Sequence, residues 1–343
     1  MIKHDKRLPV LKILTIGLLP SPLKKAYYRA KGYSLGKNIR LSIGCVIEGK
    51  DVKIRDGVKI GYLTVIRAPK IIIDRYVMIG AMSFLETEVL EIGEDTRIRE
   101  QVYIHGLKGP NSKFKIGKRS IIQMSFINPV EPIIIGDNVA IGGHALLFTH
   151  GSWLSELDGF PVNFAPITIG NNVYIAWRVT ILPGVTIGND VVIGAHSLVN
   201  KDIPSNTLAG GCPAKAIKEN YPEKKTTGEK YDLLNKMIRS FIEYIEYHGF
   251  KTEEKFISNG SHFLIYKKNR VYELLFLKNN RVPYISALDR IVIWLEMDSS
   301  NTIPRKKEMF VNISKNSRSG SSRIGEELLR YLSRYGLRFD RID

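Results

Sequence analysis

The sequence has little cysteine, no long hydrophobic run and a shortage of acidic residues. Its two cysteines, Cys45 and Cys212, are too few for a disulfide framework or a cysteine-rich zinc site, which favours the reducing cytosol. The most apolar segment, residues 8–19, is shorter than the roughly 20 residues that a membrane-spanning helix needs. A Pro-Ser-Pro segment at residues 20–22 stands where a signal peptide would have its cleavage site. We therefore expect neither a membrane span nor a signal peptide.

The shortage of acidic residues leaves 34 of them against 51 basic residues, a net charge of +17 over 343 residues. This imbalance predicts an anionic partner. Residues 1–31 contain eight basic residues and one acidic residue, and residues 222–343 contain 23 and 16, so the excess lies at the two ends. The sequence contains no RNA-binding motif with interleaved aromatic residues and no zinc finger, so nucleic acid is not expected.

A short basic helix is predicted near the N-terminus. Ser21 and Pro22 have the residue types of an N-cap and a first helical position, and Gly32 would end the helix. This helix would either be a solvated cover over one end of the next domain or make peripheral contact with a membrane surface.

Apolar residues recur at every sixth position through the middle of the chain. The longest unbroken series consists of Ile169, Ile175, Ile181, Ile187, Ile193 and Val199. Shorter series are Ile54, Ile60, Ile66 and Ile72, then Ile92, Ile98 and Ile104, then Ile135, Ile141 and Leu147. A period of six excludes an amphipathic helix, whose apolar residues recur about every 3.6 positions. The chain therefore contains a hexapeptide repeat.

A coil of three short strands per turn explains this period. About 18 residues then form one triangular turn, and every sixth side chain points to the axis. Neighbouring turns would pair as parallel strands about 4.8 Å apart. Gly-Asn-Asn at residues 170–172 and Gly-Asn-Asp at residues 188–190 would form tight corners. We predict a mainly β domain built as a parallel β-helix.

The segment from Ile135 to Ile217 resembles the hexapeptide-repeat acyltransferases, and among them the sugar O-acetyltransferases. It contains IIIGDNVAIG, FTHG, APITIGNNVYIAWRV and NKDIPSNTLAGGCPAKAIK in the order that this family has. A weaker repeat extends back to about Leu35, and nothing in the resemblance covers residues 222–343. The resemblance implies a left-handed β-helix, acetyl-CoA as acyl donor, and a homotrimer with active sites between subunits.

An interruption of the period marks a candidate catalytic site. Leu147 and Ile169 are 22 residues apart, so a loop rich in Gly and Pro leaves the coil between them. His150 lies at the start of this loop, where the sugar acetyltransferases keep their catalytic histidine. An imidazole, whose unperturbed pKa is near 6.5, can take the proton of a sugar hydroxyl as that hydroxyl attacks a thioester. The resemblance thus implies His150 as general base in a ternary complex, with a structural histidine as the alternative. Asp158 or Glu156 would orient the ring, unless both are solvated.

Coenzyme A carries phosphates, which backbone amides and cations bind. The family's motifs match this sequence at Ala195, at Lys201 within Asn-Lys-Asp, and at Lys215 within Pro-Ala-Lys. The resemblance implies that these residues contact the cofactor, with the two lysines near its phosphates.

The chain departs from the family beside this segment. Tyr174 replaces a common Trp, and Trp177 and Arg178 replace small residues. Trp177 would fill a groove or offer a surface for adenine. We include all three in the cofactor-binding set and assign no role to His196.

Acceptor contacts are expected from Asn128, His144 and Trp153, although Asn128 also precedes a proline and would fit a simple turn. A zinc site is the competing hypothesis, because His105, His144 and His150 supply three imidazoles. The Pro-Ala-Lys ending favours coenzyme A instead, so no metal is predicted.

The six-residue period stops after residue 222. A hydrophilic linker at residues 223–230 precedes a predicted helix that ends near Gly249. Further elements are predicted as strands at residues 261–266, 271–277, 291–295 and 309–313 and a helix at residues 325–335. The basic residues there either face a phosphorylated or acidic glycan or form a solvated face, and they are Lys315, Arg318, Arg323, Arg330, Arg334 and Arg338.

The sequence thus predicts three parts: an N-terminal helical segment (1–34), a β-helix acyltransferase domain (35–221) and an α+β domain of unknown role (222–343). We predict an acetyl-CoA-dependent O-acetyltransferase for a sugar or glycan precursor, working in the cytoplasm. The alternatives are an amino-sugar N-acyltransferase and a non-catalytic β-helix scaffold whose basic domain binds a partner.

Overall fold

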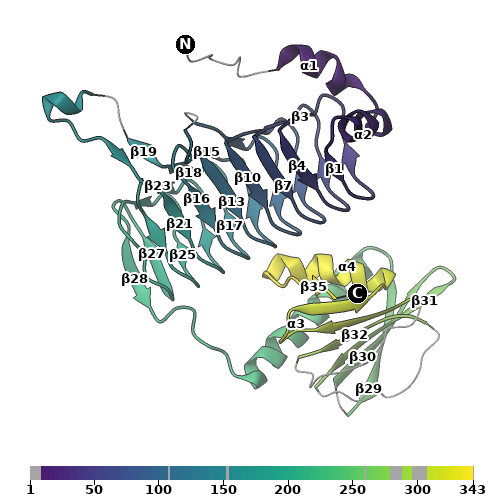
Figure 1. Cartoon of the computed structure of the whole chain (residues 1–343). Coiled ribbons are helices and arrows are strands. Elements are labelled where there is room, and N and C mark those ends of the chain that lie inside the picture. The colour runs from purple at the N-terminus through teal and green to yellow at the C-terminus, as the bar shows by residue number, and fades with distance from the viewer. Residues whose placement is uncertain are drawn as a thin grey trace. The chain divides into compact units, whose positions relative to one another are not determined.

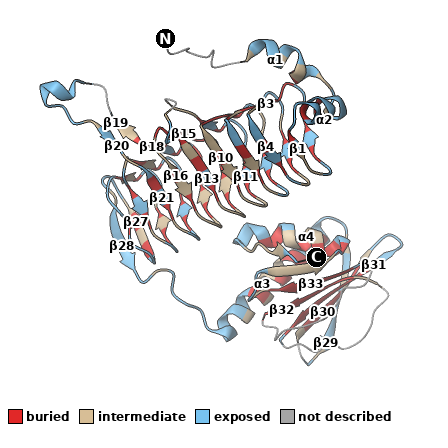
Figure 2. Cartoon of the chain, viewed as in Figure 1, coloured by how far each residue is buried: buried red, intermediate tan, exposed pale blue. Residues whose placement is uncertain are grey.

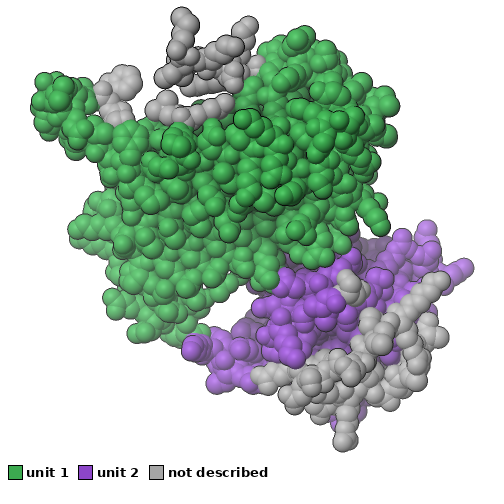
Figure 3. All heavy atoms as spheres, in the orientation of Figure 1, with its two compact units in different colours: residues 1–223 green, residues 224–343 purple. Residues whose placement is uncertain are grey.

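The chain is described by a computed structural model that covers residues 9–106, 109–151, 154–258, 260–278, 288–295 and 307–342. It divides into two compact units, residues 1–223 and residues 224–343 (Figure 3). In the first unit the chain winds through three parallel sheets in turn and forms a β-helix (Figure 1). The fold class predicted from the repeat is therefore confirmed.

The turns of the β-helix add parallel strands to the three sheets in succession, and sheet 2 ends in β28, which pairs antiparallel with β27. Sheet 1 contains, in order, β1 (Ser34–Leu35), β4 (Asp51–Ile54), β7 (Lys70–Ile73), β10 (Val89–Ile92), β13 (Lys113–Ile116), β16 (Ile133–Ile135), β21 (Ile167–Ile169) and β24 (Thr186–Ile187). Sheet 2 contains β2 (Arg40–Leu41), β5 (Lys59–Ile60), β8 (Met78–Ile79), β11 (Arg97–Ile98), β14 (Ile121–Ile122), β17 (Ala140–Ile141), β22 (Tyr174–Ile175), β25 (Val192–Ile193), β27 (Thr207–Gly210) and β28 (Lys215–Glu219). Sheet 3 contains β3 (Val46–Glu48), β6 (Val65–Arg67), β9 (Phe84–Glu86), β12 (Tyr103–Ile104), β15 (Phe126–Asn128), β18 (Leu146–Phe148), β23 (Thr180–Ile181) and β26 (Leu198–Val199).

The repeated apolar side chains fill the interior of the β-helix, which appears as buried segments along its strands in Figure 2. Ile135, Ile141 and Leu147 are fully buried, as the period predicts. The interior position predicted at Ile72 is wrong, because Ile73 is fully buried there and Ile72 is only half-buried. The reason is an extra residue in the early turns, where Asp51 pairs with a residue 19 positions on instead of 18.

Asn and Asp side chains reinforce the corners between sheets 1 and 2. The backbone amide of Asp137 donates to Oδ1 of Asn171 at 2.7 Å, and the amide of Asn171 donates to Oδ1 of Asn189 at 2.7 Å. Asn172 adopts a left-handed φ of 55°, which asparagine tolerates better than most residues. Each corner therefore supplies hydrogen bonds to the next turn.

Helices cover the N-terminal end of the β-helix. They are α1 (Val10–Leu14), η1 (Ile16–Leu18) and α2 (Ser21–Ala30). Lys24 of α2 is fully buried, and its Nζ donates to the carbonyl of Ser42 at 2.5 Å. The predicted basic helix is thus present and covers this end, although its N-cap is Pro20 and not Ser21. The predicted contact with a membrane surface stays a prediction.

Among the described residues, no helix is both long enough and apolar enough to cross a membrane. Both cysteines are free thiols. Burial raises the pKa of the Cys45 thiol, even though Lys24 lies beside it.

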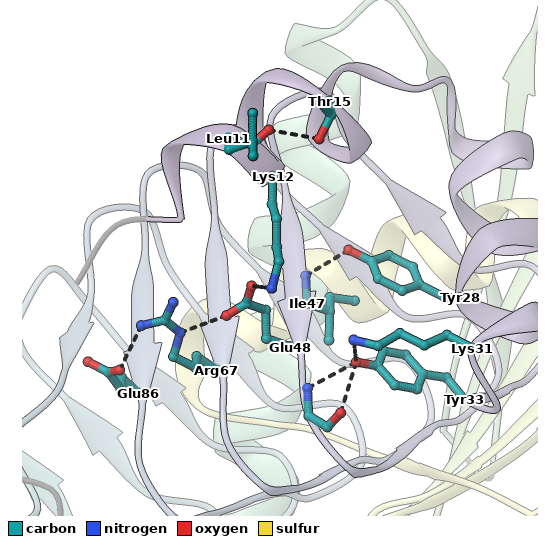
Figure 4. A network of polar contacts seen from close by, with 11 residues as sticks. Leu11, Lys12, Thr15, Tyr28, Lys31, Tyr33, Ile47, Glu48, Arg67 and Glu86 are labelled. Carbon is teal, nitrogen blue, oxygen red and sulfur yellow. Dashed lines mark hydrogen bonds and ion pairs between the residues drawn. The ribbon is translucent and has the colours of Figure 1, made fainter. Parts of the chain in front are cut away.

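A network of ion pairs connects α1 to sheet 3 (Figure 4). Glu48 contacts Lys12 of α1, and its Oε2 accepts from Nε of Arg67 at 2.8 Å. Arg67 also pairs with Glu86 in the next turn at 3.3 Å. Burial alone would raise the pKa of the Glu48 carboxyl, but Lys12 and Arg67 outweigh burial and hold this pKa below its ordinary value.

The second unit is an α+β domain, as predicted. Its sheet has the order β29 (Lys251–Ile257), β30 (Gly260–Lys267), β31 (Arg270–Leu277), β32 (Asp289–Trp294), β33 (Glu308–Asn312), β34 (Ser317–Gly320) and β35 (Asp340–Arg341). The helices are α3 (Thr227–Tyr247), α4 (Arg323–Leu332) and η3 (Ser333–Tyr335). The sequence did not predict β29, β34 and β35.

Helix α3 begins inside the predicted linker because Thr226 forms a capping box with Glu229. The Glu229 amide donates to the Thr226 hydroxyl at 3.2 Å, and the Thr226 amide donates to the Glu229 carboxylate at 2.8 Å. Phe241 of α3 and Leu328 of α4 are fully buried in one core with strand residues such as Ile291.

Because the Glu48 pKa is lowered in the folded state, its ion pairs stabilise the protein above the unfolded carboxyl pKa of about 4.3. This stability is lost as the pH falls through the folded pKa. We expect Glu48→Gln to lower the free energy of unfolding by roughly 3 kcal/mol at neutral pH. Thermal unfolding of both proteins from neutral pH to about pH 3 should show the gap closing. Glu100→Gln, at an exposed carboxylate, is the control. A gap that is constant with pH would contradict the assignment.

Candidate active site

His150 lies at the corner where the chain leaves sheet 3. Thr149 precedes it and is fully buried. The Thr149 hydroxyl donates to the Asn128 carbonyl oxygen at 2.8 Å and accepts from the Glu131 amide at 2.9 Å. Where the loop returns, the Ala165 amide donates to the Thr149 carbonyl at 3.0 Å. Thr149 therefore fixes both ends of the loop to the β-helix.

His150 also begins a short antiparallel ribbon. β19 (His150–Gly151) pairs with β20 (Asn163–Phe164), so His150 is opposite Phe164. Their rings stack with centroids 5.9 Å apart and planes 20° apart. Phe164 was not predicted as a site residue, although an aromatic residue at the returning end of the loop is a signal for it.

Two buried polar atoms at this corner have no hydrogen-bond partner among the described residues. They are Nδ1 of His150 and Oδ1 of Asn128. Asn128 ends β15 and pairs with Phe148 at the end of β18, so the two side chains come from the same corner of adjacent turns. Leaving such an atom without a partner costs about 1–3 kcal/mol. The arrangement is typical of a site where a ligand supplies the missing hydrogen bonds.

The structure does not bring Asp158 or Glu156 to His150. Both belong to η2 (Glu156–Asp158), which is exposed at the tip of the loop that projects beyond β19 in Figure 1. No hydrogen bond joins either carboxylate to the His150 ring within the described part of the chain. The ribbon pairing carries the tip away from the corner, so the predicted orienting contact is absent within one chain. Trp153, a predicted acceptor contact, lies outside the described residues.

His105 lies at the same corner one turn before Asn128. Ile104 pairs with Ile127, which brings the following residues, His105 and Asn128, next to each other in the register. The His105 ring is edge-on to Phe126, with centroids 5.2 Å apart. In the described ranges no group of three or more His, Cys, Asp or Glu side chains could hold a metal ion.

His144 lies at the other end of β18, at a corner between sheets 2 and 3. It is exposed and adopts a left-handed φ of 58°. It lines an open pocket of about 360 Å³ together with Tyr103, Phe126 and Leu146 of sheet 3. Each of these three residues directly precedes an interior position of the repeat, so its side chain points outward. The period of six therefore carries a signal for this surface. The predicted acceptor residues Asn128 and His144 are therefore on opposite edges of sheet 3.

The column of corners that carries His144 also carries three of the six predicted cofactor residues, Trp177, Arg178 and Ala195. In the next turn the Arg178 amide donates to the Gly143 carbonyl at 2.9 Å. The Trp177 ring lies 5.8 Å from the His144 ring and so close to Gly143 that a Cβ there would be 2.9 Å from it. Ala195 occupies the corner one turn further on. Trp177 is about half exposed, so it offers a flat surface beside the cation of Arg178.

The other predicted cofactor residues, Lys215, Tyr174 and Lys201, are exposed, and they lie at different places relative to this corner. Lys215 begins β28, and the preceding residue, Ala214, donates its amide to the Leu198 carbonyl at 2.8 Å, which holds the hairpin over β26. Tyr174 lies on sheet 2 in the same turn as Trp177. Lys201 follows β26 at the opposite edge of sheet 3. The structure thus groups Lys215 with the Trp177 corner and separates Lys201 from it.

The β-helix region matches known proteins. The family model described as bacterial transferase hexapeptide (six repeats) matches residues 166–201. A galactoside O-acetyltransferase of Escherichia coli (strain K12) is 38% identical over 141 residues, which are 40% of this chain and 67% of that relative. The chain belongs to the hexapeptide-repeat acetyltransferases. The family predicted from the repeat is thereby confirmed.

Two further proteins also match only part of this chain. A chloramphenicol acetyltransferase of Escherichia coli is 32% identical over 116 residues, which are 28% of this chain and 55% of that protein. The solved structure of a maltose O-acetyltransferase from Clostridium difficile 630 is 30% identical, covers 41% of this chain and 68% of that one, and has a TM-score of 0.26. The hexapeptide-repeat family therefore accounts for part of this chain only.

We expect Thr149→Val to weaken the corner that holds His150, because it removes the hydroxyl and leaves the Glu131 amide without that partner. The cost should be about 1–3 kcal/mol. The midpoint of thermal unfolding measures it. Thr168→Val, at an exposed position of β21, removes a hydroxyl for which the described residues show no hydrogen bond and should leave the midpoint unchanged. Equal midpoints for Thr149→Val and wild type would contradict this role.

Proposed function

We propose that this acetyltransferase transfers an acetyl group from acetyl-CoA to a hydroxyl of a sugar or glycan precursor, with His150 as general base. One observation carries the proposal: a histidine with a buried, unpartnered Nδ1 stands at the root of the loop that leaves the β-helix. The galactoside O-acetyltransferase relative supports a sugar acceptor. Two free cysteines support a cytosolic location.

The chemistry needs no acyl-enzyme when both substrates bind together. The His150 imidazole takes the hydroxyl proton while the sugar oxygen attacks the thioester carbon. A backbone N–H of the coil would stabilise the negative charge that develops on the thioester oxygen. When the carbon–sulfur bond breaks, the imidazolium returns the proton to the departing thiolate. Asn128 Oδ1, at the same corner, would accept from a second hydroxyl of the acceptor.

The donor would bind at the corner formed by His144, Trp177, Arg178 and Lys215. Trp177 offers a stacking surface for adenine, and the two cations suit phosphates. This corner and His150 lie at opposite edges of sheet 3, so one chain does not place the donor surface beside the base. We therefore propose a homotrimer in which the corner of one subunit faces the His150 loop of the next.

His150→Ala should lower kcat by about 10²- to 10⁴-fold, the usual contribution of a general base. Release of the coenzyme A thiol measures the rate, with hydroxyl-bearing and amine-bearing sugars compared as acceptors. Asp158→Ala should keep the wild-type rate, because this carboxylate does not contact the ring. Equal rates for His150→Ala and wild type would remove His150 as the base, and transfer to amines alone would favour an N-acyltransferase.

Mixed assemblies test whether the site is shared between subunits. His150→Ala and Trp177→Ala chains should each be weakly active alone, the second through a raised KM for acetyl-CoA. Refolding or co-expressing the two should restore part of the activity, because some interfaces then pair an intact Trp177 corner with an intact His150. The unmixed variants at equal total concentration are the control. Activity of the mixture equal to the mean of the two variants would place the whole site within one chain.

A further inference from the structure

The second unit has a pocket of its own, on the helix-covered side of its sheet. The cavity measures about 430 Å³, within the range of about 300–1,000 Å³ that small-molecule sites occupy. Tyr244 and Phe250 line it near the end of α3, and Tyr272 lines it from β31. Lys267 of β30 and Arg323 of α4 supply cations. We propose that this pocket binds an acidic sugar residue of a glycan.

The aromatic side chains give the pocket walls suited to a sugar ring. Tyr272 is almost fully buried, and the Tyr244 ring lies 4.4 Å from the His248 ring. Nδ1 of His248 lies 2.8 Å from the Tyr244 carbonyl oxygen, which fixes the imidazole against the wall. The negative face of an aromatic ring attracts the partly positive C–H groups on one face of a sugar. The walls therefore bind the apolar face of the ring, while its hydroxyls stay accessible to polar groups.

The cations of the pocket suit an acidic substituent. Lys267 Nζ lies 3.9 Å from the centre of the Phe250 ring, and the Arg323 side chain makes no ion pair with any described residue. The one carboxylate of the lining, Glu327, is 3.6 Å from Arg330, which offsets its charge and leaves it able to accept from sugar hydroxyls. The pocket lining thus has two positive side chains and one negative one, which leaves net positive charge to bind an anion.

The N-terminus of α4 is not the anion site. Asp289 Oδ1 accepts from the Arg323 amide at 2.9 Å and from the Ser322 hydroxyl at 2.7 Å. This carboxylate already occupies the first turn of the helix. Recognition of an anion therefore depends on the Arg323 guanidinium and the Lys267 ammonium, and both can be neutralised by substitution.

This inference rests on the proposed function for one point, the choice of a sugar. If the acceptor is a glycan, a second binding site on the same chain raises the effective concentration of acceptor at the catalytic unit. The net charge of +7 over residues 222–343 has the sign that an acidic glycan requires. A nucleoside phosphate also combines a ring with negative charge, and the experiment below separates it from a sugar.

Calorimetry on the full chain tests the pocket. The probes are tri-galacturonate for a carboxylate and glucose 6-phosphate for a phosphate, with the methyl ester of the first and glucose as neutral matches. We expect saturable binding of at least one acidic probe and at least tenfold weaker binding of its neutral match. Arg323→Gln and Lys267→Gln should each weaken the acidic probe about tenfold. Lys236→Gln, the same charge change at an exposed position of α3 outside the pocket, should not.

Acetyl transfer to a free monosaccharide separates this inference from the proposed function. The two pocket variants should keep the wild-type rate with that acceptor, because a monosaccharide does not need the second site. Binding that survives in both pocket variants, equal binding of acidic and neutral probes, or no binding of either acidic probe would overturn the pocket assignment. If ADP displaces the bound sugar at a lower concentration than the same free sugar does, the pocket is a nucleotide site and the assignment is overturned. If the wild-type protein itself transfers no acetyl group to a monosaccharide, the proposed function is contradicted instead.

Discussion

No single turn of the β-helix can form all the hydrogen bonds that its own backbone N–H and C=O groups need, so the turns depend on one another. Each inner strand of sheet 1 pairs with the turn before and the turn after, as β10 does with β7 and β13. The buried column of Ile, Val and Leu side chains keeps those turns in register. Extra residues fit only at the corners, where they interrupt no ladder. The His150 loop and the Trp177 surface are found at corners for this reason, whereas the N-terminal ion network joins the last residues of β3, β6 and β9 within sheet 3.

This constraint also explains why the candidate catalytic residues are separated. β18 is only three residues long, yet His144 precedes it and His150 follows it at different corners. A rigid coil cannot bend to bring the two together. The β-helix therefore supplies two fixed surfaces at the edges of one sheet. One carries His150 with Asn128 as a polar neighbour, and the other carries the exposed Trp177 beside Arg178. A second copy of the same coil is the simplest way to bring such surfaces face to face.

The sequence predicted what depends on period and missed what depends on register or packing. The six-residue repeat was enough to predict the coil, and the 22-residue gap was enough to predict the loop that leaves it. The choice of His150 within that loop came from the family resemblance, and its role stays a prediction. The early turns contain one residue more than 18, so Ile73 and not Ile72 occupies the interior position. The apolar pattern alone does not reveal this extra residue, because both positions are isoleucine. The distance of Asp158 from His150 depends on the ribbon pairing of β19 with β20, which no local pattern encodes. Similarly, the pocket of the second unit draws on elements distant in sequence, so it was not predictable from its separate residues.

One corner column shows how the protein distributes polar groups between stability and function. Near the N-terminus, Glu48, Arg67 and Glu86 occupy successive turns and neutralise one another. Further along the same corner, Asn128 and His150 have buried atoms without partners among the described residues. The same apolar core lies beneath both groups of residues. Its burial stabilises each turn enough to tolerate buried polar atoms without hydrogen-bond partners. The polar side chains are therefore paired with one another at the N-terminal end of this column, whereas at the His150 corner they keep hydrogen-bonding capacity that a ligand can use.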